Sequence, residues 1–348
     1  MEDTQHEGEA NVGRLQVVEE LRDASHTATG LQSQSSDLLE ADQVQDGCLE
    51  TDLPYGDMLG PRRNQILRIG HININGIPEL KDDEKNIRIM QAINESEMHI
   101  VGVTETNRCW HLLEEENRWR QRSKGWWETL HSSVAYNVKD GHMSTPFQPG
   151  GTMVLSCNSS AHRVFDSGRD ISRLGRWSWT KYRGKHDVVL QVISAYRPCV
   201  PTEPGDNTTH SQHQRYLDAH NDTRTPRQAL LDDLGLHIRN SQEQGDQIIL
   251  LIDCNDDVRG NTMQVWLQDH LLSDAVITRH GGENAPNTYN RGSKPIDGVF
   301  CSSTLDIKAS GYLPFSSFPS DHRAIWIDVT FDSAFGCNIP RCIQPTAR

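Results

Sequence analysis

Ser320-Asp321-His322 stands directly before the apolar segment Ala324-Ile325-Trp326-Ile327-Asp328-Val329. A Ser-Asp-His tripeptide alone is a weak signal, but here it is the last of six polar motifs, each at or near the end of a strand-like apolar segment. The other five are, in chain order, His71-Ile72-Asn73-Ile74-Asn75-Gly76, Val103-Thr104-Glu105-Thr106, Ser194-Ala195-Tyr196-Arg197-Pro198, Leu251-Ile252-Asp253-Cys254-Asn255 and Pro295-Ile296-Asp297-Gly298. Because buried strands do not normally end in unpaired carboxylates and amides, the motifs are predicted to meet in one functional site.

Apolar periodicity predicts strands and helices along the whole chain. Residues 66–74 have the pattern of a strand, residues 82–97 that of a helix and residues 99–104 that of a short buried strand, which together are typical of a βαβ unit. The polar, His-rich segment 198–222 is expected to be an irregular loop. Further strands are expected at 151–156, 177–182, 188–196, 247–252, 298–301, within 306–313 and at 324–329, and further helices at 227–243 and near 263–271. Two strand-rich halves with helices outside predict an α/β fold, a four-layer sandwich of two packed mixed β-sheets flanked by helices.

Composition divides the chain into three parts. Residues 1–64 contain 14 acidic and 4 basic residues, so they carry −10 of the formal net charge of −14 and leave −4 for residues 65–348. This acidic tail is predicted to be disordered, because it cannot bury enough apolar surface to fold alone. Its charge serves either simple solvation or an autoinhibitory, partner-binding role. A domain at 65–331 is long enough for a sizeable core, and residues 332–348 are predicted to be a short extension.

Several functional classes find no support in the sequence. The eight cysteines have no paired CxxC spacing, which argues against a zinc site. The N-terminus has no apolar signal segment and the longest apolar run is the five residues 248–252, so neither a signal peptide nor a membrane span is expected. Reduced thiols in the nucleus or cytoplasm are then expected. A Gly-rich P-loop is absent from the sequence, which leaves nucleoside triphosphate binding unsupported.

The residue types in the six motifs fit one kind of chemistry. Hydrolysis of a phosphodiester requires neutralised charge, an activated water and a stabilised leaving alkoxide, and a divalent cation serves all three needs. Mg²⁺ prefers carboxylate and water oxygens, with Mn²⁺ as the alternative cation. Glu105 follows a strand and can face a cleft, while Asp253 and Asn255, two residues apart, share one face.

The ordered series resembles the endonuclease/exonuclease/phosphatase superfamily, whose members share the deoxyribonuclease-I-like fold. The resemblance runs from about Ile66 to Val329 and follows the family's motif order throughout. Within the superfamily, the chain is most similar to the apurinic-type endonuclease of non-LTR retrotransposons. Three segments carry that likeness, namely Asn73-Ile74-Asn75-Gly76, Glu105-Thr106-Asn107 and Gly150-Gly151-Thr152.

The resemblance implies a metal side of the site. Glu105 would be the principal metal ligand, Asp321 would lie near the metal, and Asn73 matches the Asn of the family's first motif. Asn75 stands where many relatives carry an Asp ligand, which weakens metal binding on that side. The alternative for Asn75 is a tight turn with Gly76.

The resemblance also implies a phosphate side. Asp253 would orient and deprotonate the attacking water, and Asn255 would stabilise the pentacovalent phosphate. His322 would contact a phosphate oxygen while paired with Asp297. Tyr196 would hydrogen-bond the scissile phosphate, although a core tyrosine at a strand end is the alternative.

Two further positions, besides Asn75, depart from the family pattern. Ile252 stands where relatives usually have Gly before the Asp, and Cys199 stands where they often have Asn, so one phosphate or sugar contact is expected to be missing.

Basic and aromatic residues interleave within 173–183. Arg173, Arg176 and Trp177, together with Arg197, are candidates for nucleic-acid contacts, since phosphates need Arg or Lys and distorted DNA accepts aromatic wedges. An ordinary half-buried strand with a charged face is the alternative.

These observations lead to one main hypothesis and two alternatives. The main one is a Mg²⁺-dependent, monomeric endonuclease that nicks DNA and comes from a retroelement or a gene derived from one. A reverse transcriptase would then be a separate partner, because the sequence contains no such segment. The alternatives are a phosphatase or phosphodiesterase for RNA ends, nucleotides or inositol phosphates, and an inactive nucleic-acid-binding derivative.

Overall fold

The structure is a computed structural model that describes residues 52–139, 145–200, 205 and 207–337. Its strands are β1 (Tyr55–Gly56), β2 (Ile66–Asn73), β3 (Ile100–Thr104), β4 (Leu130–Ala135), β5 (Thr152–Cys157), β6 (Val164–Arg169), β7 (Trp177–Arg183), β8 (Val189–Tyr196), β9 (Gln247–Asp253), β10 (Leu272–Asp274), β11 (Asp297–Ser302), β12 (Ile307–Tyr312) and β13 (Ile325–Thr330). Its α-helices are α1 (Glu84–Glu95), α2 (Trp119–Arg122), α3 (Thr209–Ala219), α4 (Pro226–Glu243), α5 (Asn261–Asp269), α6 (Ile277–His280) and α7 (Phe331–Phe335).

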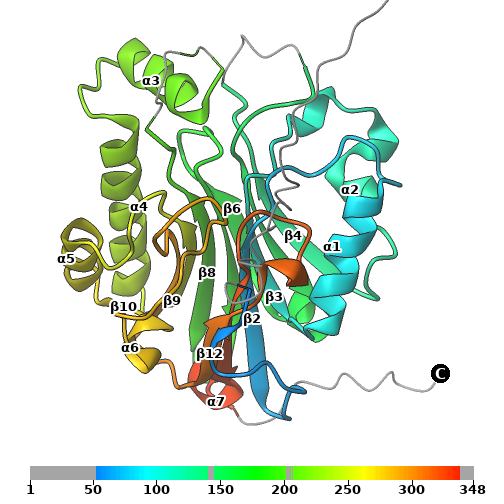
Figure 1. Cartoon of the computed structure of the whole chain (residues 1–348), viewed down its shortest axis with the longest axis vertical. Helices are drawn as coiled ribbons and strands as arrows, with labels where there is room; N and C mark the ends of the chain where they lie inside the picture. The colour runs from blue at the N-terminus through cyan, green and yellow to red at the C-terminus, as the bar shows by residue number, and fades with distance from the viewer. Residues whose placement is uncertain (1–51, 140–144, 201–204, 206, 338–348) are drawn as a thin grey trace, which may run out of the picture. The chain divides into compact units, whose positions relative to one another are not determined.

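The strands form two mixed sheets that pack face to face. The first has the order β1-β12-β13-β2-β3-β5-β4 and the second the order β10-β11-β9-β8-β7-β6. Helices α1 and α2 lie outside the first sheet, and α4 and α5 lie outside the second (Figure 1). The predicted four-layer α/β sandwich is therefore confirmed.

Three hydrophobic clusters correspond to the three interfaces between these layers. One contains Leu67, Val192 and Leu251 and fills the space between the sheets. A second joins α1 to the first sheet, and a third joins α4 and α5 to the second. Helix α4 shows how the local sequence produces such an outer layer. Thr225 caps the N-terminus of the helix, Pro226 occupies its first turn, and its apolar face is buried.

The strand registers bring the predicted motifs to one edge of the sandwich. In the first sheet Asn73, the last residue of β2, lies beside Thr104, the last residue of β3. In the second sheet Asp253, the last residue of β9, lies between Tyr196 of β8 and Asp297 of β11. Strand ends from both sheets therefore surround one location.

The folded region extends beyond the predicted domain limits at both ends. Strand β1 pairs with β12, and the Leu53 carbonyl accepts a hydrogen bond from Arg323 at 2.9 Å, so residues 52–64 belong to the fold and not to the tail. At the other end Phe335, in α7, is fully buried. The remaining parts of the predicted tail and extension, 1–51 and 338–348, lie outside the described residues.

The expectation of an irregular loop over 198–222 is wrong for its second half. Helix α3 forms there, with a capping box in which Thr208 and Ser211 each accept from the other's backbone N–H. Its polar sequence hides the helix because the buried face consists largely of polar side chains, Gln212 and His213 among them. The pattern also did not predict four strands, β1, β4, β6 and β10, which all lie at sheet edges. Strands β1 and β10 are very short, and β4 and β6 contain many polar residues.

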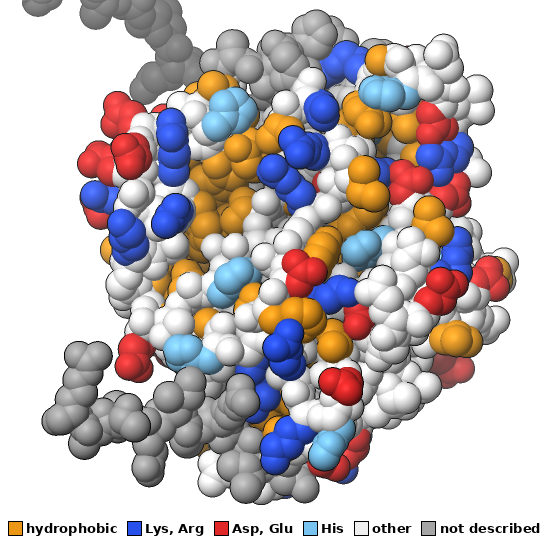
Figure 2. All heavy atoms as spheres, turned by 180° about the vertical axis from the view of Figure 1, so that it is seen from behind, with side chains coloured by type: hydrophobic (Ala, Val, Ile, Leu, Met, Phe, Trp, Pro, Cys, Tyr) orange, Lys and Arg blue, Asp and Glu red, His pale blue; other side chains and the backbone are white. Residues whose placement is uncertain are grey.

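The surface carries mixed charge. On the face seen in Figure 2, Lys and Arg side chains are interspersed with Asp and Glu, and a hollow lined by hydrophobic side chains opens in its upper left part. No helix in the described parts of the chain combines the length and apolarity that crossing a bilayer requires.

The close approach of the two sheets depends on Gly102 of β3. A Cβ at this position would lie 2.6 Å from Leu251 Cδ1 and 2.9 Å from Leu251 Cβ, on β9 of the other sheet. We expect Gly102→Ala to lower the free energy of unfolding in urea by about 1–3 kcal/mol, because Leu251 is buried and cannot move aside. Gly60→Ala is the matched control, since a Cβ there meets nothing within 4 Å. A Gly102→Ala variant as stable as this control would contradict the packing.

Candidate active site

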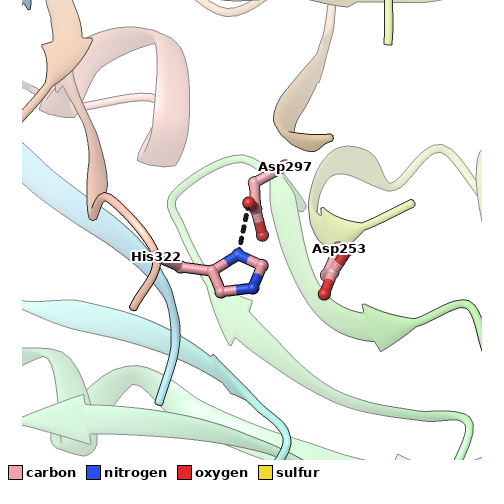
Figure 3. A group of neighbouring side chains, drawn as sticks. All are labelled: Asp253, Asp297 and His322. Atoms are coloured by element: carbon pink, nitrogen blue, oxygen red, sulfur yellow. Dashed lines mark hydrogen bonds and ion pairs between the residues drawn. The ribbon is translucent and has the colours of Figure 1, made fainter. Parts of the chain in front are cut away.

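The centre of the site is a buried pair, His322 and Asp297. His322 lies just before β13 of the first sheet and Asp297 begins β11 of the second, and their Nδ1 and Oδ2 atoms are 2.7 Å apart (Figure 3). Burial would lower the pKa of His322, but the charge of Asp297 and this hydrogen bond raise it to about 10. Burial would raise the pKa of Asp297, but the His322 imidazolium and its hydrogen bond hold it well below the usual range. The pair therefore consists of an imidazolium and a carboxylate. The contact between His322 and Asp297 that was predicted from the sequence is present.

Asp253 lies on the side of Nε2, the nitrogen of His322 that does not contact Asp297 (Figure 3). Ligand atoms of Asp253, Asp297 and His322 lie within 4.8 Å of one another, and all three residues are buried. Asp253 Oδ2 accepts from Asn73 Nδ2 at 2.8 Å, and its Oδ1 accepts from the Asn255 backbone N–H at 2.9 Å. Burial first, and then the charge of Asp297, raise the pKa of Asp253 well above the usual value. A carboxylate held in this way accepts a proton more readily than one in water.

Two further side chains from the second sheet complete this part of the site. Asn255 Nδ2 donates to the Arg197 carbonyl at 2.8 Å, and its Oδ1 accepts from the Cys199 thiol at 2.7 Å. Tyr196 is buried beside Glu105; burial first, and then the charge of Glu105, raise the pKa of its phenol well above the usual value. Cys199, which stands where relatives often have Asn, thus contacts Asn255 of the Asp253 motif.

The first-sheet motifs form a strained turn. Asn75 and Glu105 have left-handed φ angles of 46° and 51°, and the Gly76 N–H donates to the Glu105 carbonyl at 2.8 Å. The Asn75 N–H donates to Asn73 Oδ1 at 2.9 Å. This backbone fits the turn that was the alternative for Asn75, whose side chain is exposed.

Lys85, on α1, supports this turn from outside. Its Nζ donates to the carbonyls of Ile74 and Asn75 at 2.8 and 3.0 Å, and its ammonium interacts with the charges of Asp321 and Glu105. No sequence pattern indicates this contact, because a Lys on a helix is normally solvated.

The donors on this side fit a divalent cation. Asp321 Oδ1 is buried and has no hydrogen-bond partner among the described residues, while its Oδ2 lies 3.7 Å from Arg291. A carboxylate oxygen without a partner is a position that a hard cation would stabilise. Asp321 and Glu105 both interact with the charge of the Lys85 ammonium. Among the described residues, the group whose ligand atoms lie within 4.8 Å of one another is Asp253, Asp297 and His322, and the predicted ligands Glu105 and Asp321 are not part of it.

Ser320 ties the last motif to the first. Its hydroxyl donates to the Asn73 carbonyl and accepts from the His322 N–H, the latter at 3.1 Å. The Ser-Asp-His segment is thereby fixed against the end of β2.

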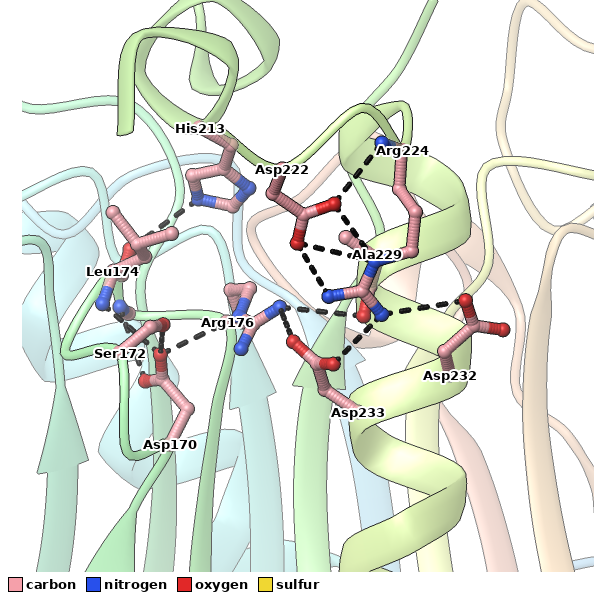
Figure 4. Close-up of polar contacts among 11 residues, drawn as sticks. Asp170, Ser172, Leu174, Arg176, His213, Asp222, Arg224, Ala229, Asp232 and Asp233 are labelled. Carbon is pink, nitrogen blue, oxygen red and sulfur yellow. Dashed lines mark hydrogen bonds and ion pairs between the residues drawn. The ribbon is translucent and has the colours of Figure 1, made fainter. Parts of the chain in front are cut away.

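The candidates for nucleic-acid contacts divide into one exposed and three buried residues. Arg173 is exposed, in the turn between β6 and β7. Arg176 is buried between Asp170 and Asp233, at 3.5 and 2.8 Å (Figure 4), and Trp177 is part of the outer core. The buried Arg197 pairs with Asp256 at 3.1 Å. Strand alternation alone does not reveal these ion pairs, because Asp233 and Asp256 come from distant segments.

Comparison with known proteins agrees with this geometry. The model of the Endonuclease/Exonuclease/phosphatase family matches residues 70–322. The chain belongs to this family. It is accordingly a metal-dependent enzyme that hydrolyses phosphate ester bonds. No curated protein matches the chain.

Solved structures of family members share the fold at low sequence identity. An AP endonuclease from Leishmania major has a TM-score of 0.57 and 11% identity, covering 76% of this chain and 88% of that one. The Xenopus laevis APE2 catalytic domain has a TM-score of 0.55 and 16% identity, with 76% and 92% covered. The human Nocturnin catalytic domain with bound sulfate has a TM-score of 0.53 and 16% identity, with 77% and 95% covered.

The contact between His322 and Asp297 predicts non-additive mutations. We expect His322→Ala and Asp297→Ala each to lower the hydrolysis rate by on the order of 10²-fold, and the double variant to be scarcely slower than either, because the two residues act as a unit. Steady-state rates of the four proteins on one substrate test this. Effects that multiply would show that the two side chains act separately.

The charged state of His322 predicts a pH dependence. Its raised pKa keeps the imidazolium protonated at neutral pH, so kcat/KM should fall as the pH rises through about 10. Asp297→Asn removes the stabilising charge, and the fall should then move to lower pH. Asp306→Asn, at an exposed carboxylate, is the control and should leave the profile unchanged. An unshifted fall in Asp297→Asn would exclude His322 as the titrating group.

Proposed function

We propose that this enzyme is a Mg²⁺-dependent endonuclease that nicks DNA. The observation that carries the proposal is the convergence of a charged His322–Asp297 pair, the buried base Asp253 and the orphaned Asp321 oxygen at one edge of the sandwich. Within one site, the His322 imidazolium can bind a phosphate oxygen, Asp253 can accept a proton, and Asp321 offers a hard oxygen ligand. One of the structural relatives, from Leishmania major, is an AP endonuclease, which supports DNA as the substrate.

The roles of the site residues follow from their positions. Glu105 and Asp321, with Asn75 at the rim, would hold the cation, which when bound neutralises phosphate charge and promotes water ionisation. His322 donates its Nε2 proton toward a phosphate oxygen. Asp253, oriented by Asn73, accepts the proton of the attacking water.

The other polar groups stabilise the phosphate as it gains a fifth oxygen. Asn255 is held by the Arg197 carbonyl and by Cys199, which orients its amide. Tyr196 presents its phenol beside Glu105. Directed donors of this kind act where charge develops in the transition state.

The closeness to retrotransposon endonucleases is part of the proposal. The three segments that carry the likeness are hydrogen-bonded to one another. The Gly76 N–H donates to Glu105, the Thr106 N–H donates to the Gly151 carbonyl at 3.3 Å, and Asn107 Oδ1 accepts from Gly150 at 2.7 Å. They therefore form one structural unit around the turn at Glu105, and a shared ancestry of this unit explains their joint occurrence. In such an element the nick would leave a 3′-hydroxyl for a reverse transcriptase.

The charge distribution favours a second candidate function. Residues 65–348 carry a net charge of −4, and basic and acidic side chains alternate over the surface in Figure 2. A small phosphate ester, such as a nucleotide, an inositol phosphate or an RNA end, needs less positive surface than duplex DNA.

A plasmid assay tests the proposal. We expect supercoiled plasmid to be nicked with Mg²⁺ and not with EDTA, and Glu105→Gln to lower the rate by about 10²-fold or more, since loss of one ligand charge removes several kcal/mol of transition-state stabilisation. Glu116→Gln, at an exposed carboxylate, is the matched control. Turnover of small phosphate esters without nicking would select the second candidate, and wild-type nicking by Glu105→Gln would remove Glu105 from the metal site.

A further inference from the structure

The Asp297 carboxylate has a second histidine on its other side. Asp297 Oδ2 accepts from His322, and Oδ1 lies 3.4 Å from Nε2 of His71. His71 lies on β2, and its side chain and that of Asp297 are both fully buried. Neither ring nitrogen of His71, nor Asp297 Oδ1, makes another hydrogen bond among the described residues.

Two buried polar groups that face each other in this way can satisfy only one another. Leaving an imidazole N–H or a carboxylate oxygen unpaired in a protein interior is unfavourable. A proton on Nε2 of His71 would pair these two atoms, since Nε2–H then donates to Asp297 Oδ1, and it leaves Nδ1 of His71 without a partner among the described residues. The separation of 3.4 Å is at the long end for this bond, and a shift of a few tenths of an ångström would bring it to the usual distance.

The contact also restricts how the carboxylate can turn. A carboxylate held at one oxygen rotates about its Cβ–Cγ bond, whereas one held at both oxygens has a fixed plane. The orientation of the His322 ring follows that plane through its Nδ1 bond. Because His71 belongs to the first sheet and Asp297 to the second, the packing of the sheets sets this orientation.

We propose that His71 is a positioning residue for the phosphate-binding histidine: it donates to Asp297 Oδ1 and thereby holds His322 with its free nitrogen toward the cleft. This proposal rests on the proposed function for its kinetic consequence but not for its structural one. His71 is part of the first polar motif, but a single buried histidine has no spacing or neighbours in sequence that would indicate this role.

The test compares His71→Ala with His71→Gln and with a stability control. Outer partners of site residues typically contribute 10–100-fold to activity, so His71→Ala should lower kcat by about 10-fold and leave KM unchanged. Gln places an amide near the position of Nε2, and His71→Gln should recover activity to within about threefold of wild type. Arg68 lies on the same strand as His71 and forms a buried ion pair with Asp328 of β13. Arg68→Met breaks this pair without touching the site, and should lower stability but not kcat.

A spectroscopic measurement separates this proposal from the function itself. The proton shared by His322 Nδ1 and Asp297 gives a downfield proton NMR resonance in the metal-free protein, assigned by its loss in His322→Ala. It should move in His71→Ala and return in His71→Gln. If His71→Ala keeps both the wild-type resonance and the wild-type kcat, or loses activity only as much as Arg68→Met, the proposal is overturned. A wild-type protein that hydrolyses no phosphate ester would overturn the proposed function, while the resonance would still decide the role of His71.

Discussion

The site depends on one buried charge, the carboxylate of Asp297. It begins a strand of the second sheet, and both of its oxygens face histidines that belong to the first sheet, His71 and His322. An uncompensated charge at this depth would be strongly destabilising, so Asp297 requires an imidazolium partner. The partner in turn keeps its proton because Asp297 is charged. The protein thereby holds a positively charged imidazolium at the site, and the position of that imidazolium is set by the packing of the two sheets.

A second constraint is backbone geometry at the strand ends. Asn75, Glu105 and Asn255 all have left-handed φ angles, at 46°, 51° and 45°. Asn tolerates this region, but Glu rarely adopts it, and such strain persists only where the surroundings enforce it. Here the Gly76 N–H and the chain at Gly150 and Gly151 bind the segment 105–107 from two sides. The chain therefore turns sharply after each of these three strands.

The sequence predicted which strand ends lie close together better than it predicted which side chains surround them. Strand ends such as Asp253 and Asn73 can be located from apolar periodicity, and strand ends of neighbouring strands must meet at one edge. The partner of a buried side chain cannot be found in this way, because it depends on how separate segments pack. Arg176 and Trp177 look like a nucleic-acid surface in sequence, yet Asp233 of α4 and the outer core enclose them. Helix α3 was missed for the same reason, since its buried face is polar and is satisfied by contacts such as Asn137 with Gln212 at 3.0 Å.

The local charge at the site has a different effect on substrate binding from the net charge of the domain. Residues 65–348 are weakly acidic, so long-range attraction of a polyanion is small, and the net charge alone gives no advantage in substrate capture. Within the site, however, several carboxylates are offset by His322 and Lys85, and the orphaned Asp321 oxygen leaves a local excess of negative charge. A bound cation would reverse the sign of this local field, because it adds positive charge beside these carboxylates. We therefore expect the affinity for a phosphate ester to rise when a cation occupies the metal side. The metal and the substrate would then be coupled through the carboxylates of the site, and not through the surface of the domain.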